Sequence, residues 1–231
     1  MTAPPLLEAR SVHRTYRRAG QKVSALCGVT VAVPPGSVTG LLGRSGSGKS
    51  TLARCLALLE RPDAGEIRFR GSPTSTWRGP ELARGRRKVQ LVMQEAVRAI
   101  NPRFTVGEAV AEPLEILDVP KAERLDRAAA LLTELQLDRD LMPRPARRLS
   151  GGQVQRLALA RALACDPKVL ILDEALAGLD LAVRAELVDR LEALRSTRGL
   201  ALVVLSHDRP LVERWASAMY EMSAGALVAG H

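Results

Sequence analysis

The residues Gly43–Ser50, with the sequence GRSGSGKS, fit the pattern GxxxxGK[ST]. They follow an apolar run at 39–42 and precede a segment typical of a helix, which is the setting that a phosphate-binding loop requires. Glycines let backbone N–H groups surround a polyphosphate, the lysine offsets phosphate charge, and the serine hydroxyl reaches Mg²⁺. The residues expected to bind a nucleotide here are Gly43, Arg44, Ser45, Gly46, Ser47, Gly48, Lys49, Ser50 and Thr51.

Two acids, Asp173 and Glu174, end the continuous apolar run at 169–172. Such a run is typical of a strand that is buried on both faces of a parallel sheet. If this strand lies beside the phosphate loop, Asp173 anchors Mg²⁺ and Glu174 polarises the attacking water as a general base. The alternative, a strand that merely leaves the core through acidic residues, is disfavoured by the phosphate loop.

A second helix start suited to an anion occurs at Leu149–Gln153, LSGGQ. Ser150 can cap the helix, and Gly151 and Gly152 leave backbone N–H groups uncovered before an apolar periodic run. Uncovered N–H groups and the positive end of the helix dipole together attract anions. The sequence therefore contains two phosphate-binding helix starts, and the second needs an explanation.

Three further residues gain interest from their position along the chain. Gln94 ends the run at 89–93, where its amide can reach Mg²⁺ or water, although a lone Gln at a strand end is usually surface. His207 follows a buried strand at 202–206, where it faces the ligand crevice of a parallel sheet, although a lone His is more often structural. Tyr16 can stack on a base in a chain with few aromatic residues.

The order of apolar patterns predicts an α/β fold in which a P-loop NTPase core of mixed sheet carries an N-terminal antiparallel β region and an α-helical insert at about 95–165. A short helix and a hairpin through Tyr220 and Leu227 are expected to close the chain. The strands are expected at 6–12, 29–33, 38–42, 66–70, 89–93, 169–172 and 200–205, and the main helices at 50–59, 107–117, 122–137, 151–164 and 181–195.

Composition limits the function further. Of 231 residues 46% are hydrophobic and only 3% aromatic, and the net charge is +9. Few aromatic residues disfavour a single-stranded nucleic-acid binder, and the basic clusters at Arg84–Lys88 and Arg144–Arg148 sit beside turn residues rather than on a helical stripe. The charge is then either a general arginine bias or an attraction to an anionic membrane surface.

The cysteines and the apolar runs indicate the compartment. Cys27, Cys55 and Cys165 form no CxxC pair and stand among apolar neighbours, so we expect buried, inert thiols and no metal site. Their odd number, without a signal peptide, indicates a reducing cytosol. The apolar runs are shorter than the ~20 residues of a membrane span, so any membrane role is expected to be peripheral.

Taken in order, these motifs resemble those of an ABC-type ATPase subunit. The resemblance rests on Tyr16, the loop 43–50, Gln94, LSGGQ at 149–153, Asp173-Glu174, Leu179-Asp180 and Ser206-His207. It implies one domain over residues 1–231, with an α/β core at 1–94 and 166–231 and a helical subdomain at about 95–165.

The resemblance also implies roles for individual residues. ATP and Mg²⁺ are the expected cofactors, with Mg²⁺ held by Ser50, Gln94 and Asp173. Tyr16 is expected to stack on adenine, His207 to contact the γ-phosphate, and Gln94 to link the nucleotide to a transport partner. Asp180 is expected in the loop across a dimer seam. The expected partner-facing signature is Ser150, Gly151, Gly152 and Gln153, which in this family face the phosphate loop of the other subunit, so that two ATP molecules lie between two chains.

The implied partners are membrane permease subunits, a second ATPase subunit (identical or different) and an extracytoplasmic substrate-binding protein, with no nucleic acid. The expected location is cytoplasmic, peripheral on the inner face of the membrane. Gln94, Asn101–Glu108 and Ala111–Leu114 resemble the importers of dipeptides, oligopeptides and nickel or metal chelates. Met93 and Ala177 depart from the usual Phe and Ser, and the short segment after His207 favours nickel or a metallophore over peptide.

Two other functions compete with an importer subunit. A soluble ABC ATPase in a non-transport complex, such as one for phosphonate breakdown, shares every motif; co-purification with a hydrophobic permease separates it from an importer. A DNA-associated ABC ATPase needs a long coiled-coil insert, which the sequence lacks.

Overall fold

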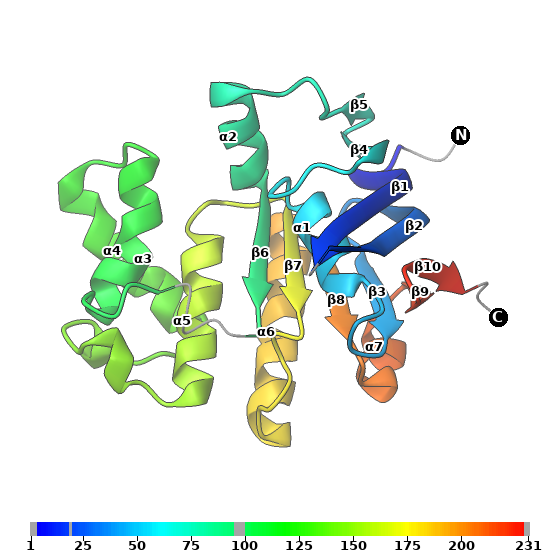
Figure 1. Cartoon of the computed structure of the whole chain (residues 1–231). Helices are drawn as coiled ribbons and strands as arrows, with labels where there is room; N and C mark the ends of the chain where they lie inside the picture. The colour runs from blue at the N-terminus through cyan, green and yellow to red at the C-terminus, as the bar shows by residue number, and fades with distance from the viewer. Residues whose placement is uncertain (1–3, 19, 95–99, 229–231) are drawn as a thin grey trace.

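The computed structural model describes residues 4–18, 20–94 and 100–228, and the arrangement of its elements is shown in Figure 1. The strands are β1 Leu7–Arg18, β2 Gln21–Val33, β3 Val38–Gly43, β4 Ala64–Phe69, β5 Ser72–Pro73, β6 Val89–Met93, β7 Val169–Asp173, β8 Ala201–Ser206, β9 Ala218–Ser223 and β10 Ala226–Val228. The α-helices are α1 Lys49–Leu56, α2 Gly79–Lys88, α3 Val106–Ile116, α4 Lys121–Glu134, α5 Gly151–Leu163, α6 Leu181–Arg198 and α7 Arg209–Trp215, with 3₁₀ turns at Arg139–Leu141 and Ala146–Arg148.

The chemistry-bearing motifs follow strands of the larger sheet. Within the described residues its order is β10-β9-β3-β8-β7-β6, and β9, β3, β8, β7 and β6 run parallel. Strands β7 and β8 are buried along their whole length. Parallel neighbours place their carboxyl ends at the same edge of a sheet, so the residues after these strands are gathered at one edge.

Alternate residues of β7 and β8 enter different cores, as the two-residue period of a strand requires. Val169 and Ile171 of β7 face a core that includes Leu52 and Leu56 of α1 and the apolar side of the antiparallel sheet. Their neighbours on β7 face the opposite core, where α5 and α6 pack. The continuous apolar run therefore has a packing partner on each side.

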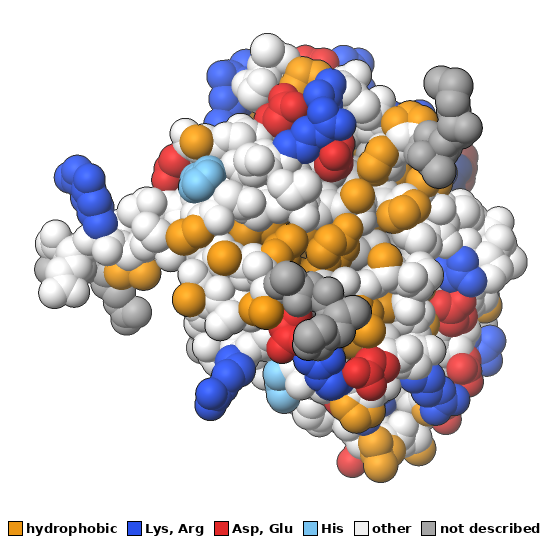
Figure 2. Space-filling view, turned by 90° about the vertical axis from the view of Figure 1, so that its right-hand side faces the viewer, with side chains coloured by type: hydrophobic (Ala, Val, Ile, Leu, Met, Phe, Trp, Pro, Cys, Tyr) orange, Lys and Arg blue, Asp and Glu red, His pale blue; other side chains and the backbone are white. Residues whose placement is uncertain are grey.

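The second sheet is antiparallel, with the order β2-β1-β4-β5 among the described strands. It covers α1 on the side away from the parallel sheet (Figure 1). Figure 2 looks at the face that carries β1, β2, β9 and β10, where apolar side chains run across the middle and charged side chains lie mainly toward the rim. This layer gives α1, and the loop before it, support from two sheets.

Helices α3, α4 and α5 lie together on the side of the parallel sheet farthest from β1 and β2 (Figure 1). Their shared core includes Val110, Leu132 and Leu157. Reciprocal capping boxes begin α3, through Thr105 and Glu108, and α5, through Ser150 and Gln153. The capping predicted for Ser150 is therefore confirmed.

The predicted mixed α/β fold is confirmed, with differences in the β1–β2 hairpin and at α2. Strands β1 and β2 are longer than expected, because their polar halves pair as a hairpin that no apolar alternation marks. Helix α2 was not predicted; its sequence is strongly polar and contains Gly85, where a Cβ atom would lie 2.4 Å from the Trp77 ring. The prediction that Arg84–Lys88 sits beside a turn is wrong, because these residues form the last turns of α2.

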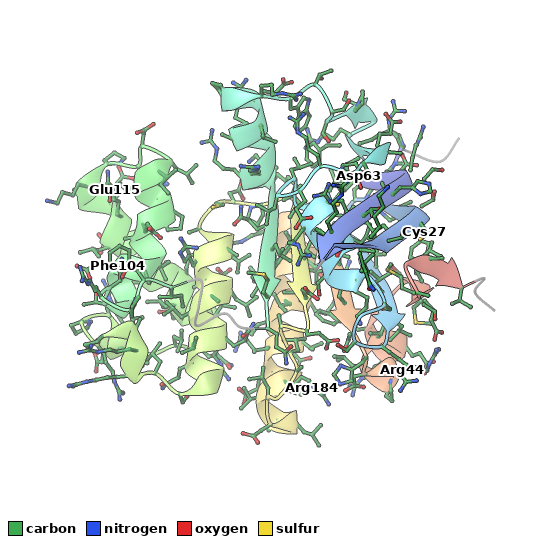
Figure 3. All side chains as sticks on the ribbon, viewed as in Figure 1. Cys27, Arg44, Asp63, Phe104, Glu115 and Arg184 are labelled. Atoms are coloured by element: carbon green, nitrogen blue, oxygen red, sulfur yellow. The ribbon has the colours of Figure 1, made fainter. Side chains whose placement is uncertain are left out.

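The prediction for the cysteines holds only in part. Cys55 is buried, and burial raises the pKa of its thiol to about 11, which keeps it protonated. Burial also raises the pKa of Cys165. Cys27, however, is exposed on β2 (Figure 3), because this part of the hairpin has a solvent-facing side. None of the helices among residues 4–18, 20–94 and 100–228 is both long enough and apolar enough to cross a membrane.

Candidate nucleotide site

Four neighbouring strands bring the predicted chemistry to one edge of the parallel sheet. Along the order β3-β8-β7-β6, the segments that leave the carboxyl ends begin with Arg44, His207, Glu174 and Gln94. The register pairs Leu42 of β3 with Ser206, the last residue of β8. It likewise pairs Met93, the last residue of β6, with Asp173, the last residue of β7. The motifs that are far apart in sequence therefore converge, as a P-loop nucleotide site requires.

The phosphate loop joins β3 to α1 through a backbone that only glycine accommodates at two points. Gly48, the N-cap of α1, has φ 104°, and a Cβ atom there would lie 2.4 Å from the carbonyl oxygen of Ala25. At Gly43 a Cβ atom would lie 2.6 Å from both the Met222 carbonyl oxygen and the Ser47 hydroxyl. The absence of side chains at these points leaves room for backbone N–H groups to approach a phosphate.

The outer part of this loop is open to solvent. Arg44, labelled in Figure 3, is exposed, and so are Ser45 and Gly46. The inner part is held, since Ser47 N donates to the Arg44 carbonyl at 3.2 Å and the Ser47 carbonyl accepts the Gly225 N–H at 3.0 Å. Hydrogen bonds therefore anchor the inner part of the loop, while its outer part faces solvent.

Lys49, Glu174 and His207 meet at this edge. Lys49 is buried, and its Nζ donates to the carbonyl oxygens of Gly43 at 2.5 Å and Arg44 at 3.2 Å. The same Nζ lies 3.8 Å from Glu174 Oε1, and His207 Nδ1 lies 3.0 Å from Glu174 Oε2. The Lys49 ammonium group and the His207 imidazole therefore both contact the Glu174 carboxylate beside the phosphate loop.

The position of Glu174 is fixed through its backbone. Glu174 has φ 52°, a left-handed conformation that is uncommon for residues other than glycine. Its N–H donates to the Leu205 carbonyl at 3.0 Å, which holds this turn against the neighbouring strand. Uncommon backbone conformations of this kind are concentrated at functional sites.

Asp173 offers the oxygen that a metal ion needs. Its side chain is 7% exposed, and Oδ1 is buried without a hydrogen-bond partner among the described residues. Burial raises the pKa of Asp173, while a hydrogen bond with the Ser50 hydroxyl acts in the opposite direction. A buried carboxylate oxygen without a partner, beside a hydroxyl, fits the oxygen-rich coordination of Mg²⁺.

We expect Asp173→Asn to raise the thermal stability of the metal-free chain at neutral pH, because the amide removes a buried charge whose Oδ1 atom has no hydrogen-bond partner among the described residues. A cost of about 1–3 kcal/mol for an unsatisfied buried group corresponds to roughly 2–4 °C in Tm per kcal/mol for a chain of this size. Calorimetry in a chelating buffer measures this difference. Because burial raises the folded-state pKa of Asp173 above 3.8, the difference should shrink as the pH falls through the folded-state pKa and be smallest below 3.8, where both the folded and the unfolded state are protonated. A lower Tm for the variant at neutral pH would contradict the prediction.

Tyr16 is held at the edge of α1 by a network that the sequence did not indicate. Its hydroxyl donates to the Glu60 carboxylate and accepts from Arg54 Nη2 at 3.2 Å, and Arg54 Nε also donates to Glu60 at 2.6 Å. The Arg14 guanidinium lies 5.1 Å from the ring centroid, a cation–π contact. These contacts therefore hold the Tyr16 ring in one orientation beside α1, the helix that follows the phosphate loop.

The LSGGQ segment is not brought to the phosphate loop of its own chain. Within the described residues, the side-chain hydrogen bonds of Ser150 and Gln153 link only these two residues, at 3.0 and 3.3 Å. Around Gly151 a Cβ atom would meet no atom within 4 Å, so the helix start is open. The next residue, Gly152, lies against the segment after Asp180, since a Cβ atom on Gly152 would be 3.6 Å from Val183. The structure thus groups Ser150 with the surface near Asp180.

Comparison with known proteins identifies the family. A family model described as "ABC transporter" matches residues 26–177. The chain belongs to the ABC transporter family. This ABC subunit is 41% identical over 217 residues to the nickel import ATP-binding protein NikE of Escherichia coli (strain K12), which covers 94% of this chain and 81% of that protein. It is 42% identical over 234 residues to the protein of the same name from Rhodospirillum rubrum, with 97% and 83% covered.

Solved structures agree with the fold of the ABC subunit. The dimeric ATP-binding cassette MJ0796, bound to ADP and Pi after hydrolysis, matches with a TM-score of 0.87 and 29% identity over 96% of each chain. The cbiO1 protein of Clostridium perfringens matches with a TM-score of 0.85 and 27% identity, covering 97% of this chain and 87% of that chain. The predicted family and fold are confirmed: the chain is an ABC ATPase that binds ATP, and such subunits act as dimers with membrane permease partners.

Proposed function

We propose that this subunit hydrolyses ATP to power a membrane importer of nickel or a nickel chelate. The main support for this proposal is that the phosphate loop, Asp173, Glu174 and His207 lie at one edge of the parallel sheet. The chain is also 41% identical to a protein named for nickel import. Because these relatives are named for nickel import, the proposal favours nickel over peptide and an importer over the non-transport alternative.

The proposed chemistry assigns one task to each side chain. Backbone N–H groups of the loop 43–51 and Lys49 bind the phosphates, and the Tyr16 ring stacks on adenine. Glu174 takes a proton from the attacking water, and His207, 3.0 Å from Glu174, contacts the γ-phosphate. Ser50, Asp173 and Gln94 would hold Mg²⁺, which neutralises phosphate charge when bound. Gln94 directly follows β6, the strand that pairs with β7 at Asp173. Its side chain is exposed, which suits a contact with a partner protein.

We further propose that each nucleotide lies between two ATPase subunits. Ser150, Gly151, Gly152, Gln153 and Asp180 lie outside the cradle of their own chain, and the helix start at Ser150 is open. Uncovered N–H groups at this helix terminus suit a phosphate that another chain carries. The second phosphate-binding helix start is thereby explained: one serves this chain's nucleotide and the other serves its partner's.

The remaining assignments concern architecture and partners. We assign the chain to one ABC ATPase domain, with a core at 1–94 and 166–231 and a helical subdomain at about 95–165. The permease is proposed to dock at 94–106; the part of this region at 95–99, including Ala99, lies outside the described residues. An extracytoplasmic substrate-binding protein would deliver the cargo, and the subunit would sit on the cytoplasmic face of the membrane through the permease.

Nickel uptake tests the proposal. Co-expressed with the permease and binding-protein genes of its own locus in cells that lack nickel importers, the wild-type subunit should support uptake of radioactive nickel. The Glu174→Gln variant should reduce uptake at least ~10-fold, because hydrolysis drives the transport cycle and a general base contributes about 10²–10⁴ in rate. Uptake of a labelled dipeptide without nickel would refute the cargo. Failure to co-purify with any permease would refute the importer.

A further inference from the structure

An ion pair joins the start of α6 to the start of α7. Arg184 Nη1 lies 2.5 Å from Asp208 Oδ2, and the two side chains are 23% and 29% exposed. Arg184 belongs to the first turn of α6, where its N–H donates to the Asp180 carbonyl at 2.9 Å. Figure 3 places Arg184 near the end of α6 that follows Asp180. Asp208 directly follows His207, so the pair spans the gap between the segment after Asp180 and the histidine.

Asp208 is held in two further ways. Its Oδ1 accepts the Leu211 N–H at 3.1 Å and caps α7, and its own N–H donates to the Ser206 hydroxyl at 3.0 Å. The pKa of Asp208 is lowered first by the bond from Leu211 and also by Arg184, with burial opposing. Asp208 is therefore charged at neutral pH, and each of its polar contacts fixes the chain next to His207.

His207 itself has little packing to fix it. Its side chain is 68% exposed, and the contact to Glu174 is the hydrogen bond that the structure gives it among the described residues. An exposed imidazole on a free backbone samples several rotamers, whereas catalytic geometry tolerates displacements of well under 1 Å. The backbone at 206–208 must therefore supply the precision.

We propose that Arg184 is a positioning residue for His207, which it holds by anchoring Asp208 to the first turn of α6. The pair also couples two parts of the site. A shift of the segment at Asp180, which is proposed to face the second subunit, moves the start of α6, and Arg184 transmits that shift to the residue after His207. The inference rests on the proposed function, in which His207 contacts the γ-phosphate.

Substitution of Arg184 tests the inference in the assembled transporter complex. Arg184→Ala should lower kcat for ATP hydrolysis roughly 10-fold, because a slightly misplaced catalytic group reduces the rate steeply. KM for ATP should change less than about twofold, since Arg184 does not contact the phosphate loop. Arg184→Lys, which keeps the charge but not the planar fork, should recover part of kcat.

A matched control lies on the same helix. Arg198 pairs with Glu134 at 2.6 Å and has a similar exposure, but this pair links α6 to α4, away from His207. Arg198→Ala should leave kcat within about twofold of wild type even if both variants lower Tm equally. An equal loss of kcat in Arg198→Ala and Arg184→Ala would reduce Arg184 to a general stabilising contact and overturn the inference.

A double-mutant cycle decides whether Arg184 acts through His207. In a His207→Ala background, Arg184→Ala should cause no further loss of kcat, because the positioned group is already gone. If the two losses multiply, Arg184 acts by another route and the inference fails. A failure of the proposed function is distinguishable, because His207→Ala alone would then leave kcat unchanged.

Discussion

Replacing Glu174 with glutamine should reduce ATP hydrolysis by about 10²–10⁴-fold while ATP binding stays at its original affinity. The amide keeps the shape of the carboxylate but cannot take a proton from water. The phosphate loop, Lys49 and the proposed Mg²⁺ ligands stay in place, so the ground-state contacts to ATP persist. Single-turnover hydrolysis in the assembled complex, together with equilibrium titration of ATP, measures the two quantities separately.

Glu213→Gln serves as the control for this experiment. Glu213 is exposed on α7, pairs with Arg209 at 3.4 Å and has no role in the proposed nucleotide chemistry. The complex that contains Glu213→Gln should hydrolyse ATP at the wild-type rate. A Glu174→Gln complex that also turned over at that rate would exclude Glu174 as the base, whereas lost binding would show that Glu174 supports the cradle instead.

Much of the site could be predicted because each motif combines local backbone chemistry with a strand or helix boundary. The loop 43–50 needs glycines at positions such as Gly48, whose backbone leaves no room for a Cβ atom. Asp173 follows an apolar run whose alternate residues enter two cores, and such a run is typical of a central strand. Because central parallel strands end at one edge, the convergence of Gly43, Asp173 and His207 followed from topology.

The contacts that lacked a local signature could not be predicted. Glu60 and Arg54 orient Tyr16, yet the three residues come from a strand, a helix and a loop with no fixed spacing. The Arg184–Asp208 pair likewise joins residues that look like ordinary surface charges. Helix α2 shows the same limit, because its sequence is strongly polar and the close approach of Gly85 to Trp77 has no signature in the sequence.

The proposed sharing of ATP between two chains makes the strongest prediction for a mixture of two inactive variants. Ser150→Arg fills the open helix start with a cationic side chain but leaves the phosphate loop intact. Lys49→Ala weakens phosphate binding in the loop but leaves the helix start intact. On a Glu174→Gln background, neither variant alone should form an ATP-dependent pair, because each of its two sites has one defective half.

Mixed together, the variants should regain pairing in the fraction of dimers that contains one of each. In such a dimer one site combines the intact loop of the Ser150→Arg chain with the intact helix start of the Lys49→Ala chain, and the other site carries both defects. Cross-linking with ATP reads the outcome. Ser196→Arg, which adds the same charge at an exposed position of α6, should pair like the Glu174→Gln parent.

If each site lay within one chain, every site in the mixture would keep one defect and no pairing would return. The geometry favours recovery, because the helix start at Ser150 is open and Ser150 bonds to Gln153, while the contacts of Lys49 Nζ are to the Gly43 and Arg44 carbonyls and to Glu174. Should the natural partner be a different ATPase, Ser150→Arg must instead silence the partner's site and leave nucleotide bound at Lys49. Loss of nucleotide at Lys49 in that pair would place Ser150 in its own chain's site and refute the shared arrangement.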